Sequence, residues 1–122
     1  MDTSQKYIFQ CEEAEEIQAL RPSGADEHDY FYCKVHGLGC DLDNAVWLPL
    51  QAQLQEMVRE RAEEVKNSEG LIWTLLLVIQ SWSWQNWHYA KTFTSMEQLW
   101  LAAVMDWKFN KKWNGIDWIK EF

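Results

Sequence analysis

The aromatic residues and the negative charge of this chain occupy different parts of the sequence. Eight of the nine tryptophans lie between Trp73 and Trp118. Residues 1–69 hold 15 acidic and 6 basic residues, a net charge of −9, whereas residues 70–122 hold 4 and 5, a net charge of +1. Each buried Trp side chain removes about 150–250 Å² from water. The sequence therefore predicts an acidic N-terminal layer, solvated or facing a partner, and an aromatic C-terminal core.

The length of 122 residues, with 48% hydrophobic and 25% charged residues, is typical of one globular domain. We expect a single domain over 1–122, with an acidic α/β part over 1–45 and a helical part over 46–122. A part of 45 residues rarely folds alone without metal or disulfides, so the two parts are expected to share one core.

No secretory or membrane signal is found in the sequence. The chain starts without a basic segment that leads into an apolar run. The longest apolar stretch, Leu71 to Ile79, is about half of the roughly 20 residues that a membrane-spanning helix needs. Three cysteines without a secretory signal do not indicate a disulfide framework. We therefore expect a soluble, cytoplasmic protein.

Short elements are predicted for the N-terminal part. The apolar and aromatic patterns indicate a strand over 6–11, a helix over 12–20 that Pro22 to Gly24 end, a second strand over 30–35, and an irregular acidic segment over 40–48. The two strands are expected to form a small ribbon.

Three longer helices are predicted for the C-terminal part, over 50–66, 71–90 and 94–113. The helix over 71–90 is apolar around its whole circumference, which is typical of a central helix covered on several sides. The third helix starts at a capping box, with Thr94 as N-cap and Glu97 reaching back, and Gly115 is expected as its left-handed cap. Residues 116–122 are too apolar to stay in solvent, and they are expected to pack back on the chain or to pair with a partner. The predicted fold class is α+β: a small two-stranded N-terminal ribbon with a short helix, packed on a Trp-rich three-helix layer.

One set of side chains has the composition of a metal site: Cys11, His28, Cys33, His36 and Cys40. Cys33 and His36 have the spacing of a zinc knuckle, but a structural zinc site generally contains two such close pairs. A reduced Cys in an apolar segment is also an ordinary small core residue. We expect neither a bound metal nor any other cofactor, although the sequence leaves zinc binding by Cys11, Cys33, His36 and Cys40 open.

No motif indicates catalysis. The chain lacks a nucleophile elbow and a glycine fingerprint for phosphates. Carboxylate pairs such as Asp41 with Asp43 are expected on a solvated face, where nothing raises their pKa for acid–base work. His88 is expected to be a buried, hydrogen-bonded side chain. We predict that the protein is not an enzyme and has no catalytic residue.

The net charge of −8 excludes classes of partner. A duplex-DNA binder or a protein on an anionic membrane needs a basic face. The segment from Lys108 to Trp113 mixes cations with rings, as single-strand binders do, but lysines at a helix end that complement the helix dipole explain it better. We expect no direct contact with nucleic acid and no membrane.

Two functions of different class remain. The first is a non-enzymatic acidic binding protein that blocks a basic or nucleic-acid-binding surface of a protein partner, such as a nuclease or a nucleic-acid-binding complex. Immunity proteins and phage-encoded anti-defence inhibitors offer an analogy of size and charge alone. The alternative is a small adaptor or assembly subunit that completes a larger complex through apolar helix faces. The oligomeric state is left open.

Two groups of residues are predicted to bind the partner. Acidic side chains steer the first contact, and an apolar helix face anchors it: Asp26, Glu27, Asp29, Asp41 and Asp43 form the first group, and Leu101, Met105 and Phe109 form the second. Trp100 and Trp107 are two turns apart on the other face of that helix. We expect both rings to be buried against the helix over 71–90.

Overall fold

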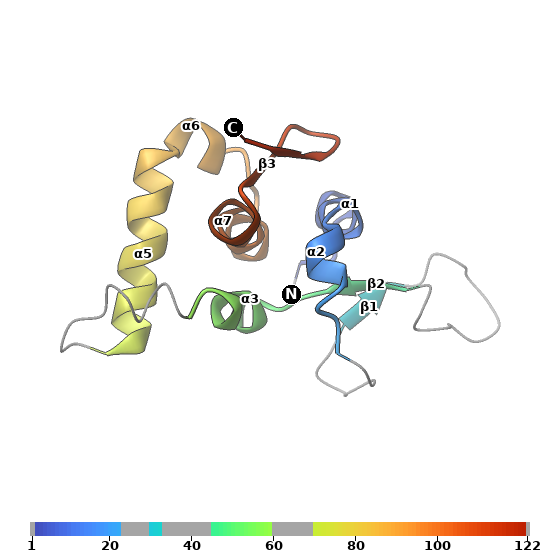
Figure 1. Ribbon diagram of the computed structural model, residues 1–122, viewed down its shortest axis with the longest axis horizontal. Helices are drawn as coiled ribbons and strands as arrows, with labels where there is room; N and C mark the ends of the chain where they lie inside the picture. Colours follow the sequence, from blue (N-terminus) through green and yellow to red (C-terminus); the bar gives the residue numbers. More distant parts are fainter. Residues whose placement is uncertain (1, 23–29, 33–44, 60–69, 122) are drawn as a thin grey trace.

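The computed structural model describes residues 2–22, 30–32, 45–59 and 70–121 (Figure 1). In chain order the elements are α1 (Gln5–Glu13), α2 (Glu15–Gln18), β1 (Tyr30–Tyr32), β2 (Val46–Leu48), α3 (Gln51–Met57), α5 (Leu71–Gln85), α6 (Trp87–Ala90), α7 (Met96–Phe109), β3 (Lys111–Trp113) and β4 (Trp118–Lys120). Two antiparallel strand pairs, β1 with β2 and β3 with β4, accompany the helices. The predicted α+β fold class is confirmed.

Helix α7 lies in the middle of the fold. Figure 1 shows α5 on one side of α7, α1 and α2 on the other, α3 on a third, and the β3 and β4 pair above. Five consecutive residues of α7, Leu101 to Met105, are completely buried. A helix covered on several sides needs apolar residues all round. The prediction that the helix over 71–90 is the central one is therefore wrong, because α7 takes that place and α5 lies at the edge.

The first predicted strand, over 6–11, is the helix α1 instead. Ser4 caps it, because the Ser4 Oγ accepts a hydrogen bond from the backbone N of Tyr7 at 3.2 Å. Tyr7, Cys11 and Ala14 are buried at intervals of four and three residues, which is the spacing of a helix face. The β-branched and aromatic composition of this segment thus serves one buried helix face. The helix predicted over 12–20 is divided at Ala14, and only Glu15–Gln18 forms α2.

The ribbon has a different pair of strands from the predicted pair. β1 lies within the predicted strand over 30–35, and it pairs with β2 in the register Tyr30↔Leu48, Phe31↔Trp47 and Tyr32↔Val46. β2 lies in the segment that the sequence predicted as irregular. The three residues of β2 are all buried, and α1 packs on β2. Residues of a strand buried on both faces lose the alternation that would reveal them.

The long C-terminal helices are present with changed ends. α3 begins at Gln51, one residue after the predicted start, and ends at Met57, with Val58 as its C-cap. Residues 60–66, where the predicted helix continued, lie outside the described residues. The helix predicted over 71–90 breaks at Asn86 into α5 and α6. The N-cap of α7 is Ser95, one residue after the predicted Thr94, and its Oγ accepts from Gln98 N at 3.1 Å.

The end of α7 is also earlier than predicted. Asn110, with φ 54° and ψ 44°, forms the left-handed cap that was predicted for Gly115. Gly115, with φ 102°, instead lies in the turn between β3 and β4. The pairing of β4 with β3 confirms that the C-terminal segment packs back.

Long-range contacts join the start of the chain to its end. The indole Nε1 of Trp118 donates to the carbonyl oxygen of Gln10 at 2.9 Å, and Lys111 forms an ion pair with Glu16. The Tyr7 hydroxyl donates to the Pro49 carbonyl at 2.6 Å, and burial raises the pKa of this hydroxyl. The N-terminal helices are thereby fixed against β2 and the β3–β4 pair. Within the part of the chain that the structure describes, no helix has the length and apolar character needed to cross a membrane.

Candidate functional site: the outward face of α5

Helix α5 is apolar on two opposite faces. Leu75, Ile79 and Trp82 are buried on its inner side, toward α7. Opposite them lies the outward face, which we define as Trp73, Leu76, Leu77, Gln80 and Trp84. At about 100° per residue these five side chains fall within one arc of the helix. Four of them are large apolar groups exposed to solvent, with exposed fractions of 47% for Trp73, 53% for Leu76, 41% for Leu77 and 72% for Trp84.

The outward face carries no charge. Between Leu71 and Ala90 the sequence contains no Asp, Glu, Lys or Arg. An exposed helix face is ordinarily occupied by charged and polar side chains, and contiguous exposed apolar patches mark interaction sites. The uninterrupted absence of charge over 20 residues is the sequence signal for this face. Because the same segment is apolar around its circumference, the pattern predicts a covered central helix, and it gives no sign of the exposed face.

A hydrogen bond and ring contacts hold α5 in place on α7. The indole Nε1 of Trp82 donates to Asp106 Oδ2 at 2.8 Å. The Trp82 ring also meets Trp107 edge to face, with 6.0 Å between the ring centroids, a favoured geometry for aromatic pairs. The orientation of the outward face is therefore set by contacts on the inner side of α5.

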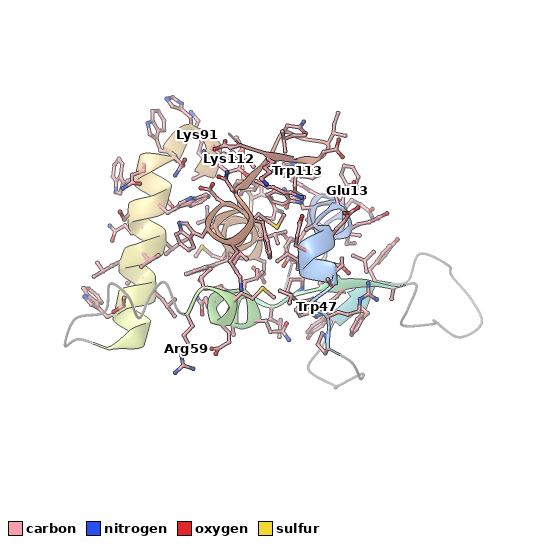
Figure 2. The ribbon with its side chains drawn as sticks, in the orientation of Figure 1. Glu13, Trp47, Arg59, Lys91, Lys112 and Trp113 are labelled. Atoms are coloured by element: carbon pink, nitrogen blue, oxygen red, sulfur yellow. The ribbon has the colours of Figure 1, made fainter. Side chains whose placement is uncertain are left out.

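The short helix α6 is fixed to the β3 strand. The side chain of Asn86 donates to the Trp82 carbonyl at 2.9 Å and accepts from Lys112 Nζ at 3.1 Å. The Tyr89 hydroxyl accepts from Trp113 N at 2.8 Å, and burial raises the pKa of this hydroxyl. Figure 2 shows Lys91 and Lys112 close to α6. These contacts turn the chain at Asn86 and place the rings of α6 beside the end of α5.

A groove lies at the α6 end of the outward face. It has a volume of about 390 Å³ and is lined by Gln80, Ser83, Trp84, Trp87, Ala90, Lys91 and Leu99. Lys91 Nζ lies 4.6 Å from the centroid of the Trp87 ring, a cation–π distance, and His88 stacks on the same ring at 3.7 Å. We call it the Trp84–Trp87 groove. It combines apolar walls with one cation.

The predicted apolar partner surface on α7 is wrong. Leu101 and Met105 are completely buried, because the middle of α7 is covered on several sides, and Phe109 is half-buried. Trp100 is buried as predicted and borders a small cavity with residues of α3 and α5. Trp107 meets α5 through Trp82, as predicted, but it is only partly buried.

The predicted acidic contacts, Asp26, Glu27, Asp29, Asp41 and Asp43, lie outside the described residues. The acidic side chains that are described in this half include four glutamates of α1 and α2: Glu12, Glu13, Glu15 and Glu16. Figure 1 shows α1 and α2 on the opposite side of α7 from α5. This described acidic cluster and the outward face therefore lie on different sides of the molecule.

Two smaller predictions concern His88 and the lysines at the end of α7. His88 is exposed and stacked on Trp87, so the prediction of a buried histidine is wrong. Lys108 lies in the last turn of α7, where a cation complements the helix dipole as expected. Lys112 lies 3.4 Å from a carboxylate oxygen of Glu121, and Lys111 pairs with Glu16. These pairs explain two of the lysines as structural contacts.

Cys11 is the one member of the candidate metal set that the structure describes. It is buried in α1, and burial raises the pKa of its thiol, which disfavours the thiolate that binds metals. His28, Cys33, His36 and Cys40 lie outside the described residues. Among the residues that are described, no three His, Cys, Asp or Glu side chains gather around a common point that could hold a metal ion.

No known protein family, curated protein or solved structure matches this chain.

Proposed function

We propose that this protein is a non-catalytic assembly subunit that binds a protein surface through the outward face of α5. The observation that supports this proposal is the exposure of Trp73, Leu76, Leu77 and Trp84 on one charge-free helix face. Tryptophan is enriched among the residues that dominate binding energy at protein interfaces. The proposed subunit is the small adaptor or assembly subunit expected from the sequence, and its apolar binding surface lies on α5, not on α7.

The exposed rings supply an energetic reason for binding. Covering apolar surface stabilises a complex by about 25 cal/mol per Å², and a fully covered Trp removes about 150–250 Å² from water. Covering the exposed part of Trp84 therefore contributes roughly 3 kcal/mol before the costs of association are subtracted. The inner-side contacts of Trp82 hold the ring-bearing face in one orientation, which lowers the ordering cost of binding.

The acidic binder that blocks a basic protein surface is the second candidate. The charge difference of −9 against +1 between the two halves favours it, since carboxylates steer a basic partner into contact. Its test is separate from that of the first proposal. Charge reversal of Asp26, Glu27 and Asp29 together, or of Asp41 and Asp43, is expected to slow association while leaving the melting temperature unchanged. Association is also expected to slow at high salt.

A site-specific photo-crosslinker tests the assembly proposal. Benzoylphenylalanine is placed at Trp84, on the outward face, and in a control variant at Ile119 of β4, which is 48% exposed. Both variants are expressed in the native cells and illuminated. We expect a discrete protein adduct from position 84, identified by mass spectrometry, and none from position 119. Equal or absent adducts at both positions would refute the assignment of the outward face as a protein-binding surface.

A further inference from the structure

The outward face has an exposed ring near one end and a groove at the other. Trp73 and Trp84 are separated by eleven residues, which is about three helical turns or roughly 16 Å along α5. Trp84 forms one wall of the Trp84–Trp87 groove. The Trp73 ring projects from the outward face, and the Trp84–Trp87 groove of a second copy can receive it. A face that carries both can bind a second copy of itself.

Antiparallel pairing of two α5 helices brings Trp73 of each copy to the Trp84–Trp87 groove of the other. When a two-fold axis lies midway between residues 78 and 79, Trp73 of one copy faces Trp84 of the other. The same axis places Leu77 of one copy opposite Gln80 of the other, so that this leucine meets an uncharged side chain of the outward face. In an isologous dimer, residue i contacts residue j while residue j contacts residue i. The pairs Trp73–Trp84 and Leu77–Gln80, all from the outward face, therefore each occur twice in the dimer.

We propose that the outward face is covered by a second copy of this chain, in an antiparallel α5–α5 dimer in which Trp73 of each copy enters the Trp84–Trp87 groove of the other. The proposal rests on the proposed function, because it names the partner that the outward face binds. Lys91 lies beside the groove, in cation–π contact with Trp87, and the incoming indole extends this contact to a second ring face.

The charge distribution favours a second copy at this face. Each chain carries a net charge of −8, so two copies repel one another in most orientations. The outward face has no charged side chain, and the described glutamates of α1 and α2 lie on the other side of α7. Contact through α5 therefore keeps these acidic side chains of the two copies far apart. A strongly basic partner would find no carboxylate on this face to pair with.

The size of the face sets the expected strength of the dimer. The exposed parts of Trp73, Leu76, Leu77 and Trp84, together with Trp87 of the groove, amount to roughly 400–600 Å² per copy, when a fully covered Trp is taken as about 150–250 Å². Two copies then bury about 800–1,200 Å², which is the size of weak, reversible interfaces. We expect a reversible dimer with a dissociation constant on the order of micromolar.

Sedimentation equilibrium of the purified chain tests the dimer. We expect a concentration-dependent change from 14.6 kDa to twice that mass. Trp84→Ser is expected to weaken the dimer at least tenfold, and Gln80→Glu, which is nearly isosteric, is expected to weaken it by bringing two carboxylates together near the axis. Gln85→Glu, on an exposed position of the same helix farther from the axis, is the matched control and should change the dissociation constant less than twofold. Circular dichroism of each variant confirms that it is folded.

Cysteine cross-linking tests the antiparallel register. About 4.5 Å along the helix axes separates the two copies of residue 80, whereas about 20 Å separates the two copies of residue 85. Gln80→Cys is therefore expected to form a disulfide-linked dimer under mild oxidation, and Gln85→Cys is not. Peptide mapping identifies the bond, with the unsubstituted chain as the control for its native cysteines. Equal cross-linking at both positions indicates parallel helices and overturns the proposed register.

The oligomeric state and the photo-adduct at position 84 together distinguish a wrong partner from a wrong binding surface. A chain that remains monomeric at 200 µM excludes the second copy as the partner. If position 84 then still gives a photo-adduct with a different protein, the proposed function holds and only the dimer is refuted. If the chain is a dimer that Trp84→Ser and Gln80→Glu do not weaken, the interface lies elsewhere, and the inference is overturned.

Discussion

The indole nitrogen of Trp82 donates a hydrogen bond to the Asp106 carboxylate at 2.8 Å, and this bond joins the edge helix α5 to the central helix α7. Trp107, one residue after Asp106, adds an edge-to-face contact to the same ring. The inner face of α5 thus packs on α7 and the outward face is exposed, although both faces are apolar. Trp82 fixes the helix, and Trp73 and Trp84 are left facing the solvent.

Replacing Trp82 by Phe is expected to destabilise the fold by about 2–3 kcal/mol. The change removes the hydrogen bond to a charged acceptor and part of the buried ring. Urea unfolding followed by circular dichroism measures the free energy of unfolding. Trp73→Phe on the exposed side of the same helix is the control, with an expected change below about 0.5 kcal/mol when unfolding is measured at concentrations where the chain is monomeric. Equal losses for the two variants would show that the Trp82 bond contributes nothing.

The burial of Met105 leads to a prediction opposite to that of the sequence, which assigned this residue to a partner surface. Met105→Ala removes a completely buried side chain from α7, and such changes cost about 2–5 kcal/mol. Met96→Ala, at an exposed position near the start of the same helix, is the control. Thermal unfolding measures the stability of both variants. A Met105→Ala protein as stable as Met96→Ala would show that Met105 is exposed, as the sequence predicted.

Asp2 gives the stability a dependence on pH. Burial acts to raise the pKa of this carboxyl, but hydrogen bonds from Ser95, Ser4 and Gln98 together hold the pKa below the ordinary value of 3.8 for an Asp side chain. Because its pKa is lowered in the folded state, the Asp2 carboxylate contributes fully to the free energy of unfolding above pH 3.8. This contribution is lost as the pH falls through the pKa of the folded state. Because Asp2 is partly exposed, solvent screening limits the effect to less than about 1 kcal/mol.

The Asp2→Asn variant measures this contribution. Near pH 7 the free energy of unfolding of Asp2→Asn is expected to be slightly below that of the wild type. This difference between the two proteins should shrink as the pH falls below 3.8. Asp117→Asn, in the exposed turn before β4, changes the net charge equally and serves as the control. A wild-type advantage that grows at low pH would contradict the assignment of a lowered pKa.

Periodicity predicted the helices that pack by one face and failed where residues are buried on two sides. The segment over 6–11 has strand-like composition, but its buried positions have helical spacing. The three residues of β2 are all buried and so show no alternation. Apolar residues all round predicted the wrong central helix, because both α5 and the middle of α7 have this pattern and only α7 is covered on several sides. The choice between α5 and α7 depends on tertiary contacts, which the sequence pattern does not contain.

The candidate site was missed for the same reason. A charge-free stretch from 71 to 90 is expected both for a buried helix and for an exposed binding face. The deciding observation is that Trp84 is 72% exposed while Leu101 and Met105 are completely buried. Local capping signals were accurate to within one residue at the start of α7. They failed at its end, where Asn110 rather than the expected Gly115 has the left-handed conformation.

Two substitutions at the Asn110 cap distinguish the cost of backbone strain from the cost of a lost hydrogen bond. Asn tolerates its φ of 54° better than other residues that carry a Cβ atom. Its side-chain Nδ2 also donates to the Glu121 carbonyl at 2.6 Å. Asn110→Ala loses both advantages and is expected to cost about 1–2 kcal/mol. Asn110→Gly loses only the hydrogen bond and should cost less, since Gly adopts positive φ freely. Denaturant unfolding of the two variants, with exposed Lys120→Ala as the control, measures the difference. If Asn110→Ala proves the more stable of the two, Asn110 does not adopt the left-handed conformation, and α7 continues beyond Phe109 toward the end that the sequence predicted.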